Sequence, residues 1–228
     1  MQEKRKIGLL VAVEMDSVFA RYGTPGKTER RGGFDVFHYE NEQYILYVIH
    51  SGIGEIAAAA AAQLLIDRYG VELIVNFGVV GGLTEEMAQT KTCVVTRVVH
   101  YDFDLSGIDP VPPAQYPGFP DVYLPADAAL VEKARAVCPE LKPVTCASAD
   151  KFVGSREDKE RLHRLYGADI CEMESAAVLL TCLRCEIPCL MIKAVSDGLT
   201  GGGEEYYEAL QKSAALCLAV TDRIIREL

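Results

Sequence analysis

Apolar and polar positions along this chain form two alternating patterns: short apolar runs, and longer segments of helical composition. The apolar runs predict strands at residues 7–13, 34–39, 44–50, 71–77, 93–99, 144–148, 168–171 and 188–195. The composition between them predicts helices at residues 54–68, 126–137, 156–166, 172–184 and 204–228. Since strands and helices alternate with short links, we expect a single α/β domain over residues 1–228, with a mixed central sheet flanked by helices.

Two segments interrupt this alternation. Gly78 to Gly82 follow the strand at 71–77 and predict either a close backbone approach to a flat ligand or a tight turn. Residues 109–125 hold six of the ten prolines and predict an ordered surface loop or a flexible flap. The chain shows no repeat, no low-complexity tail and no linker, so these segments leave the domain prediction unchanged.

Charge and hydropathy narrow the classes of partner. The chain has 33 acidic against 23 basic residues and a formal net charge of −10, which argues against a nucleic-acid partner. No stretch approaches the roughly 20 apolar residues of a membrane-spanning helix. The apolar run at 7–13 is too short for a secretion signal. We therefore expect a cytoplasmic protein with no membrane partner.

The eight cysteines favour reduced, buried thiols over disulfides, because no secretion signal accompanies them. Cys182 and Cys185 have the spacing of a redox or zinc pair. They lie on an apolar helical stretch, however, and no second Cys/His pair stands at a matching distance. We therefore predict no metal site.

The predicted strands end in carboxylates, glycines and a few apolar residues, and not in arginines or paired histidines. Ligands of open α/β sheets bind at the carboxyl ends of the strands, so these segments are the candidate site. They are Glu14–Asp16, Ser51–Gly54, Gly78–Gly82, Asp150–Val153, Glu172–Glu174 and Ser196–Gly198.

Each segment alone also has a simpler explanation. Ser51–Gly54 suits a phosphate cradle or a plain helix N-cap. Glu172–Glu174 suits a solvated helix start, where acids favour the helix dipole. Asp197 suits a cap of the last helix, although glycines separate the two. Only the ordered set is specific.

Taken in order, five segments resemble the nucleoside phosphorylase and nucleosidase superfamily, most of all its 5′-methylthioadenosine/S-adenosylhomocysteine nucleosidase branch. The segments are Lys6–Glu14, Ser51–Gly54, Asn76–Leu83, Glu172–Ala177 and Lys193–Asp197. The resemblance runs from about Lys6 to Leu228 and implies the phosphorylase/hydrolase-like three-layer sandwich, no cofactor and a homodimer. It implies hydrolysis of the N-glycosidic bond of an adenine nucleoside, through a transition state like an oxocarbenium ion.

The resemblance also assigns roles to the acidic residues. Asp197 would donate a proton toward N7 of the purine, oriented by Ser196. Glu174 would grip the ribose hydroxyls, with Met173 against the sugar. At the position of the glutamate that activates water in the family, this chain has Asp16, which is one methylene shorter. Glu14 is the alternative base.

The apolar residues complete the candidate site. Phe152 would stack on the purine, and Val153 would offer backbone hydrogen bonds to it. Val80 and Gly81 would let the backbone approach the ligand. Ile108, from a loop of the partner subunit, would suit a methylthio or thioether group. The remaining candidate substrate-binding residues are Glu172, Val79 and Ile53.

Other departures leave the activity open. Val79, Lys193 and Lys91-Thr92 replace residues that are usual in the family. Asn76 stands where phosphorylases carry a phosphate-binding arginine, which favours water as the nucleophile, although Arg21, Arg30 or Arg31 could compensate. Two alternatives are a phosphate-dependent phosphorylase and a nucleoside-binding protein that has lost catalysis, the latter suggested by Asp16.

Overall fold

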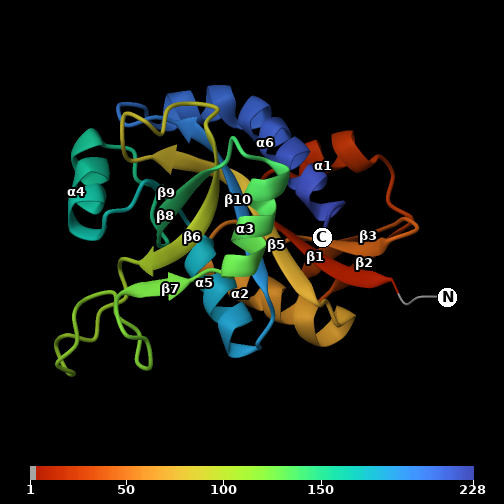
Figure 1. Ribbon diagram of the computed structural model, residues 1–228, viewed down its shortest axis with the longest axis horizontal. Helices are drawn as coiled ribbons and strands as arrows, with labels where there is room; N and C mark the ends of the chain where they lie inside the picture. The colour runs from red at the N-terminus through yellow and green to blue at the C-terminus, as the bar shows by residue number, and fades with distance from the viewer. Residues whose placement is uncertain (1–3) are drawn as a thin grey trace.

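Ten strands form one mixed sheet in the computed structural model, which describes residues 4–228 (Figure 1). The strands are β1 (Arg5–Val11), β2 (Lys27–Arg31), β3 (Phe34–Glu40), β4 (Tyr44–His50), β5 (Leu73–Gly82), β6 (Thr92–His100), β7 (Tyr123–Pro125), β8 (Lys142–Ser148), β9 (Ile170–Glu172) and β10 (Cys189–Asp197). The helices are α1 (Met15–Tyr22), α2 (Glu55–Leu64) with its π-helical extension η1 (Leu65–Tyr69), α3 (Ala128–Val137), α4 (Arg156–Tyr166), α5 (Ser175–Arg184) and α6 (Gly203–Ile225).

The central strands run parallel, and part of the sheet closes on itself. β1 pairs in parallel with β4 and β5, and β5 pairs in parallel with β10. β10 also pairs with β6, β6 with β8, β8 with β9, and β9 returns to β5. These five strands, β5, β10, β6, β8 and β9, therefore form a ring, which brings their ends close together.

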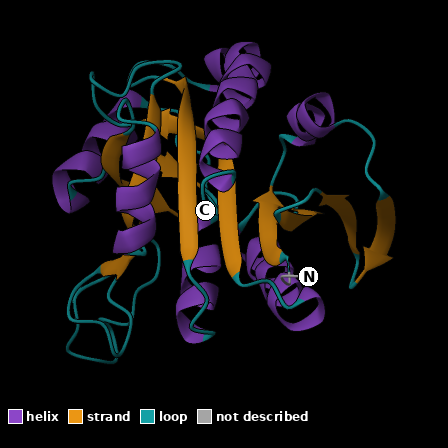
Figure 2. Ribbon diagram, turned by 45° about the vertical axis from the view of Figure 1, so that its right-hand side comes forward, coloured by secondary structure: helices purple, strands orange, loops and turns teal. Residues whose placement is uncertain are grey.

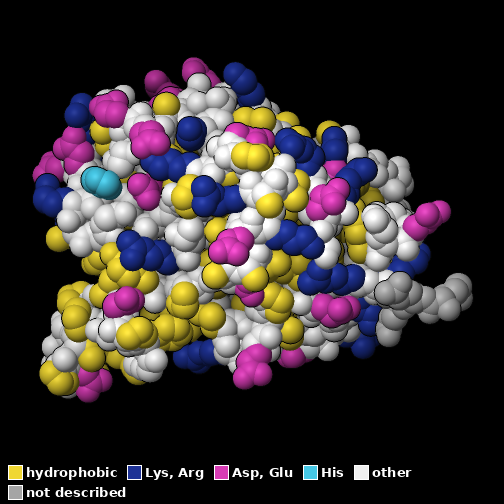
Figure 3. Space-filling view, in the orientation of Figure 1, with side chains coloured by type: hydrophobic (Ala, Val, Ile, Leu, Met, Phe, Trp, Pro, Cys, Tyr) yellow, Lys and Arg dark blue, Asp and Glu magenta, His cyan; other side chains and the backbone are white. Residues whose placement is uncertain are grey.

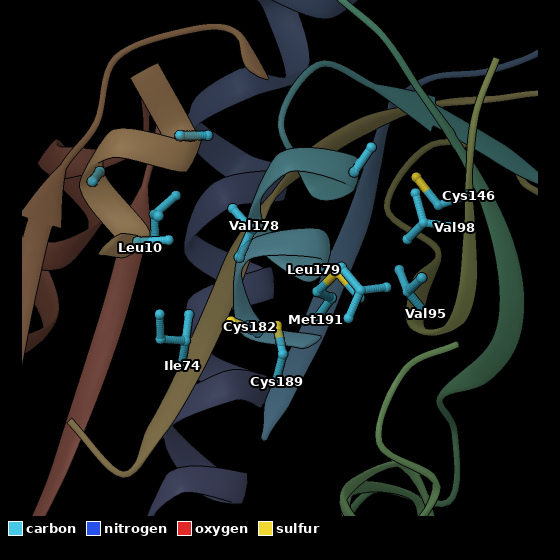
Figure 4. Close-up of a cluster of buried hydrophobic side chains, with 14 of the residues drawn as sticks. Leu10, Ile74, Val95, Val98, Cys146, Val178, Leu179, Cys182, Cys189 and Met191 are labelled. Atoms are coloured by element: carbon cyan, nitrogen blue, oxygen red, sulfur yellow. The ribbon is translucent and has the colours of Figure 1, made fainter. Parts of the chain in front are cut away.

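Helices cover both faces of the sheet, as Figure 2 shows. Buried residues of α1, α3 and α6 pack on one face, and those of α2 and α5 pack on the other. Alternation along β1 serves both layers, because Leu9 and Val11 point to the first face and Leu10 to the second. Figure 4 shows Leu10 and Ile74 of the sheet with Val178, Leu179 and Cys182 of α5 in the second layer.

Small side chains allow the second helical layer to pack closely. Ala58, Ala61 and Ala62 of α2 are fully buried where α2 crosses α5. Alanine also favours helix formation, so the six consecutive alanines serve both purposes. All eight cysteines are free thiols, and seven are buried; Cys185 is half-buried.

The predicted elements match the structure with instructive exceptions. The sequence patterns missed α1, β2 and β7, because α1 and β7 are short and β2 is polar (Lys-Thr-Glu-Arg-Arg). Gly78–Gly82, for which a close backbone approach to a ligand or a tight turn was expected, is not a tight turn but a continuation of β5. Pairing with β10 and β9 on either side keeps this glycine-rich stretch extended. The prediction of one domain over residues 1–228 stays a prediction.

Within residues 4–228, no helix is both long and apolar enough to cross a membrane.

Candidate active site

A cavity of about 510 Å³ opens at the carboxyl ends of β1, β5, β9 and β10. Its volume lies within the usual range for small-molecule sites. Four carboxylic acids face it, namely Glu14, Glu172, Glu174 and Asp197, together with apolar and aromatic side chains. The full lining is Ala12, Val13, Glu14, Ile53, Val79, Val80, Gly81, Lys151, Phe152, Val153, Cys171, Glu172, Met173, Glu174, Ser196, Asp197, Gly203, Tyr206, Tyr207 and Leu210.

Asp197 is the last residue of β10 and is 1% exposed. The register with β5 shifts between Val195 and Asp197, and such an irregularity redirects a side chain at a strand end. Ser196 Oγ lies 2.9 Å from Asp197 Oδ1, and Lys159 Nζ lies 2.6 Å from Asp197 Oδ2. Both carboxylate oxygens therefore have a hydrogen-bond donor within the protein.

Glu14 lies at the N-cap of α1, directly after the turn that follows β1. Its Oε1 accepts the backbone N–H of Val79 at 2.9 Å, and its Oε2 accepts that of Val13 at 3.0 Å. The carboxylate fits there because Gly78 has no side chain. A Cβ at Gly78 would lie 2.9 Å from Glu14 Oε1, closer than real Cβ contacts.

Glu174 stands at the N-cap position of α5, where acids are favoured by the helix dipole. Its Oε1 accepts the backbone N–H of Gly54 at 2.8 Å. Burial, followed by the nearby negative charge of Glu172, raises the pKa of Glu174 to about 7, although the Gly54 hydrogen bond opposes this. Glu174 therefore changes charge near neutral pH.

Glu172 is neutralised by a buried cation. Lys193 Nζ donates to Glu172 Oε2 at 3.2 Å and to Asn76 Oδ1 at 2.6 Å. Burial raises the pKa of Glu172, but Lys193 and donors that include Ser175 together bring it below its ordinary value. The Lys193 and Asn76 departures from the family pattern therefore belong to one hydrogen-bonded unit.

Glu55, the first residue of α2, is a further acid near the cavity that was not predicted from the sequence. It is buried, with Oε1 2.5 Å from Ser148 Oγ and Oε2 accepting the backbone N–H of Ala177 at 2.6 Å. Burial, followed by the charge of Glu172, raises the pKa of Glu55 to about 8. Its place in a glycine-rich helix start gave no sign that it would be buried beside two other acids.

An aromatic wall faces the acids. Phe152 meets Tyr206 edge to face, with ring centroids 5.7 Å apart, and Tyr207 lies next to Tyr206. Phe152, Tyr206 and Tyr207 all line the cavity, as do Val153, Met173 and Ile53. Tyr206 and Tyr207 lie in the polar first turns of the amphipathic helix α6, so only the fold brings them to the cavity.

Two predicted site residues lie elsewhere. Asp16 was expected to share the hollow with Glu174 and Asp197, but it is exposed in the first turn of α1 and does not line the cavity. β1 ends at Val11 and α1 begins at Met15, so Glu14 and Asp16 do not lie on one strand: Glu14 is buried, whereas Asp16 is exposed on the helix. Ile108 is 81% exposed and does not line the cavity of its own chain. The other predicted residues all line it.

The fold and the cavity define a small-molecule-binding α/β protein with an acidic, aromatic-walled site. The family model described as "Phosphorylase superfamily" matches residues 6–226, and the chain belongs to that family. The resemblance and the fold class inferred from the sequence are thus confirmed.

Among relatives, the chain is similar to an aminodeoxyfutalosine nucleosidase of Helicobacter pylori, with 30% identity over 92% of this chain and 94% of the relative. It is also similar to a 5′-methylthioadenosine/S-adenosylhomocysteine nucleosidase of Hydrogenovibrio crunogenus, with 31% identity over 84% of this chain and 85% of the relative. A crystal structure of 5′-methylthioadenosine/S-adenosyl homocysteine nucleosidase from Helicobacter pylori matches with a TM-score of 0.94 and 28% identity, covering all of both chains.

Proposed function

We propose that this protein is a nucleosidase, which hydrolyses the N-glycosidic bond of an adenine nucleoside and releases adenine. The observation that carries the proposal is the composition of the cavity. Four acids line it, and Lys151 is the one cationic residue among the lining side chains of the described chain. Water suits such a site as nucleophile, because a phosphate ion would be repelled by the carboxylates.

The backbone groups that could hold phosphate are already occupied. The N–H of Gly54 donates to Glu174, and that of Glu55 donates to Asp150 Oδ1 at 2.7 Å. The helix start that suited a phosphate cradle therefore binds protein carboxylates. The arginines that could have compensated form ion pairs outside the cavity: Arg21 with Asp222, Arg30 with Asp35 and Arg31 with Glu29.

Three of the acids have separate roles in the proposed reaction. Glu174, in its ionised form, accepts hydrogen bonds from the ribose hydroxyls. Glu14 accepts a proton from the water that attacks C1′. Asp197, in its protonated form, donates a proton to N7 as the C1′–N9 bond breaks and its electron pair moves to the purine.

The apolar lining supports these roles. Phe152 covers one face of the purine, with Val153, Val80 and Gly81 along its edge. Met173 lies against the sugar, and Val79, Ile53 and Glu172 complete the enclosure. No metal or organic cofactor takes part in the proposed reaction.

The relatives leave two candidates for the 5′-substituent. One similar protein is a 5′-methylthioadenosine/S-adenosylhomocysteine nucleosidase, and another is an aminodeoxyfutalosine nucleosidase. Tyr206 and Tyr207 line the cavity, and tyrosine side chains contact both apolar and polar groups. Aminodeoxyfutalosine should therefore be tested as well. We propose 5′-methylthioadenosine and S-adenosylhomocysteine as the first substrates, in line with the family resemblance.

We further propose that the protein acts in the cytoplasm as a homodimer. Ile56 is 84% exposed beside the cavity residue Ile53, and Ile108 is exposed on the loop between β6 and β7. Figure 3 shows hydrophobic side chains gathered over this loop, at the lower left. An exposed apolar surface of this kind is typical of an interface. In the dimer, Ile108 of one subunit would close the 5′ side of the other subunit's cavity.

A base-release assay tests the proposal. Purified protein is incubated with 5′-methylthioadenosine, S-adenosylhomocysteine, aminodeoxyfutalosine, inosine and uridine, with and without phosphate, and free base is quantified by chromatography. We expect adenine release that added phosphate does not change. Turnover that requires phosphate or arsenate would identify a phosphorylase instead. Tight binding of an adenosine analogue without base release would identify a binding protein.

A further inference from the structure

Lys159 of α4 is a buried cation that the proposed reaction has not yet used. Its side chain is 0% exposed, whereas Arg156, Glu160 and Arg161 around it on the same helix are exposed. Figure 1 shows α4 at the edge of the molecule, where a lysine would ordinarily extend into solvent. Burying an ammonium group is unfavourable unless hydrogen-bond acceptors compensate for the lost water, so the contacts of Lys159 indicate its role.

The ammonium group has three acceptors within hydrogen-bond distance. They are Asp197 Oδ2 at 2.6 Å, the backbone oxygen of Gly198 at 2.7 Å and that of Gly201 at 3.0 Å. An ammonium group has three N–H donors, so all of them are satisfied. Each acceptor belongs either to Asp197 or to the segment directly after it.

These contacts fix two parts of the cavity at once. Ser196 and Lys159 hold the two oxygens of Asp197 from different sides, which sets the plane of the carboxylate. Residues 198–202 connect β10 to α6 and include three glycines, so this segment has few side chains to anchor it. Lys159 anchors it at the backbone oxygens of Gly198 and Gly201, and Glu205 Oε2 accepts the N–H of Gly198 at 3.2 Å. From this segment α6 carries Tyr206 into the cavity.

Gly81 of β5 lies against the ion pair of Lys159 and Asp197. A Cβ at Gly81 would lie 3.2 Å from Asp197 Oδ2 and 3.7 Å from Lys159 Cε. The strand therefore leaves Asp197 and Lys159 little room to move. A carboxylate restricted in this way can contact the purine without first changing its orientation. Such preorganisation raises the rate of the chemical step.

We propose that Lys159 is a positioning residue for the reaction, which acts by fixing the carboxylate of Asp197 and the 198–202 segment in their reactive arrangement. The inference rests on the proposed nucleosidase function, because that function gives Asp197 its task. Lys159 itself does not touch the substrate in this proposal. Its loss should therefore lower kcat more than it raises KM.

The test compares Lys159→Met with Arg161→Met, which removes an exposed cation from the same helix. Misplacing a reacting group can cost about 100-fold in rate, so Lys159→Met should lose about that factor in kcat, with KM changed far less. Arg161→Met should keep wild-type kcat and KM. Circular dichroism and thermal melting confirm that each variant is folded.

Chemical rescue separates positioning from general support of the fold. Lys159→Ala leaves space for a small amine, so ethylammonium should restore part of kcat. Tetramethylammonium carries the same charge without an N–H donor and should not. Equal rescue by both, or none by ethylammonium, would overturn the proposal. A folded Lys159→Met with wild-type kcat would also overturn it.

The remaining outcomes are also decisive. If Lys159→Met does not fold, Lys159→Gln, which keeps two N–H donors, takes its place in the same assay. If both uncharged variants unfold, Lys159 supports the fold alone and the proposal is wrong. If wild-type protein releases no base from any nucleoside while Lys159→Met is folded, it is the nucleosidase function that has failed.

Discussion

Glu14 and Asp16 lie two positions apart in the sequence, but only Glu14 faces the cavity. Its two oxygens accept backbone N–H groups of Val13 and Val79, which fixes its direction. We expect Glu14→Gln to lower kcat at least about 100-fold, because the amide cannot accept a proton from water. Steady-state base release from the preferred nucleoside measures this.

Asp16→Asn is the matched control for that change. Asp16 is exposed, so its amidation should alter kcat no more than about twofold, the usual scale of surface substitutions. The reverse result, with Asp16→Asn inactive and Glu14→Gln active, would identify Asp16 as the catalytic base, as the family resemblance indicated.

Glu174 gives the reaction an expected pH dependence. Its pKa is raised to about 7, mainly by burial and then by Glu172, and its carboxylate form is the one that accepts from ribose hydroxyls. As pH falls below 7 the group gains a proton and stops accepting. The kcat/KM for a riboside should therefore fall about tenfold per pH unit on the acid side.

Glu174→Gln provides the check on this assignment. The variant should have a lower kcat/KM at pH 8 and should lack the acid limb near pH 7. A 2′-deoxynucleoside should lose less than the riboside, since it makes one fewer hydroxyl contact. An acid limb that stays unchanged in Glu174→Gln would assign it to another group.

At the level of elements, apolar periodicity was enough to predict the central strands and most helices. β1 and β10 contain runs of buried apolar residues, and β4 alternates buried and half-buried ones; both patterns are typical of strands. The pattern could not say where β5 ends, because glycines usually stop a strand. Only pairing with β10 and β9 extends β5 through Gly82.

The same limit applies to the candidate site. Strand ends located Glu172, Glu174 and Asp197, because carboxylates directly after apolar runs are visible in sequence. Lys159 lies among charged residues of α4 and Tyr206 among acidic residues at the start of α6, so no local pattern distinguished them from surface residues. Their roles depend on packing between distant elements, which a single sequence does not show.

The start of α5 gathers an unusual concentration of acid. Glu172 accepts the N–H of Ser175, Ser148 that of Ala176, and Glu55 that of Ala177. Glu55 has a pKa of about 8 against an ordinary value of 4.5, chiefly because of burial. The folded protein therefore binds the Glu55 proton more tightly than the unfolded chain does. Because of this, the free energy of unfolding decreases as pH rises from 4.5 through about 8.

Glu55→Gln removes that loss, since the amide keeps the shape and stays neutral. We expect its Tm to match wild type near pH 5 and to exceed it at pH 9 by about 2–4 °C for each kcal/mol recovered. Calorimetry at both pH values measures the difference. Glu132→Gln, at an exposed position on α3, is the control and should show the same Tm difference from wild type at both pH values. A Glu55→Gln advantage that fails to grow with pH would contradict this account.

At the scale of the whole molecule, the cavity is assembled from segments that span most of the chain, from Ala12 to Leu210. One side of it is bordered by the exposed Ile53, next to Ile56 on the same helix start. The loop between β6 and β7 is internally ordered, with Phe103 and Tyr116 stacked at 3.9 Å and Tyr116 OH 2.7 Å from His100 Nδ1. An ordered loop that exposes Ile108 is well suited to contact a second subunit.

Ile56→Lys tests whether this surface forms the dimer. If Ile56 lies in the apolar interface, a lysine there must be desolvated without a partner, so the variant should be monomeric. Analytical ultracentrifugation should give a mass near 24.9 kDa for the variant and twice that for wild type. Because the partner's Ile108 would no longer close the cavity, KM for a 5′-thioether nucleoside should rise more than KM for adenosine. Leu165→Lys, an equally drastic change at an exposed leucine of α4, should stay dimeric with wild-type KM. A wild-type protein that sediments as a monomer yet turns over normally would show that each subunit completes its own site.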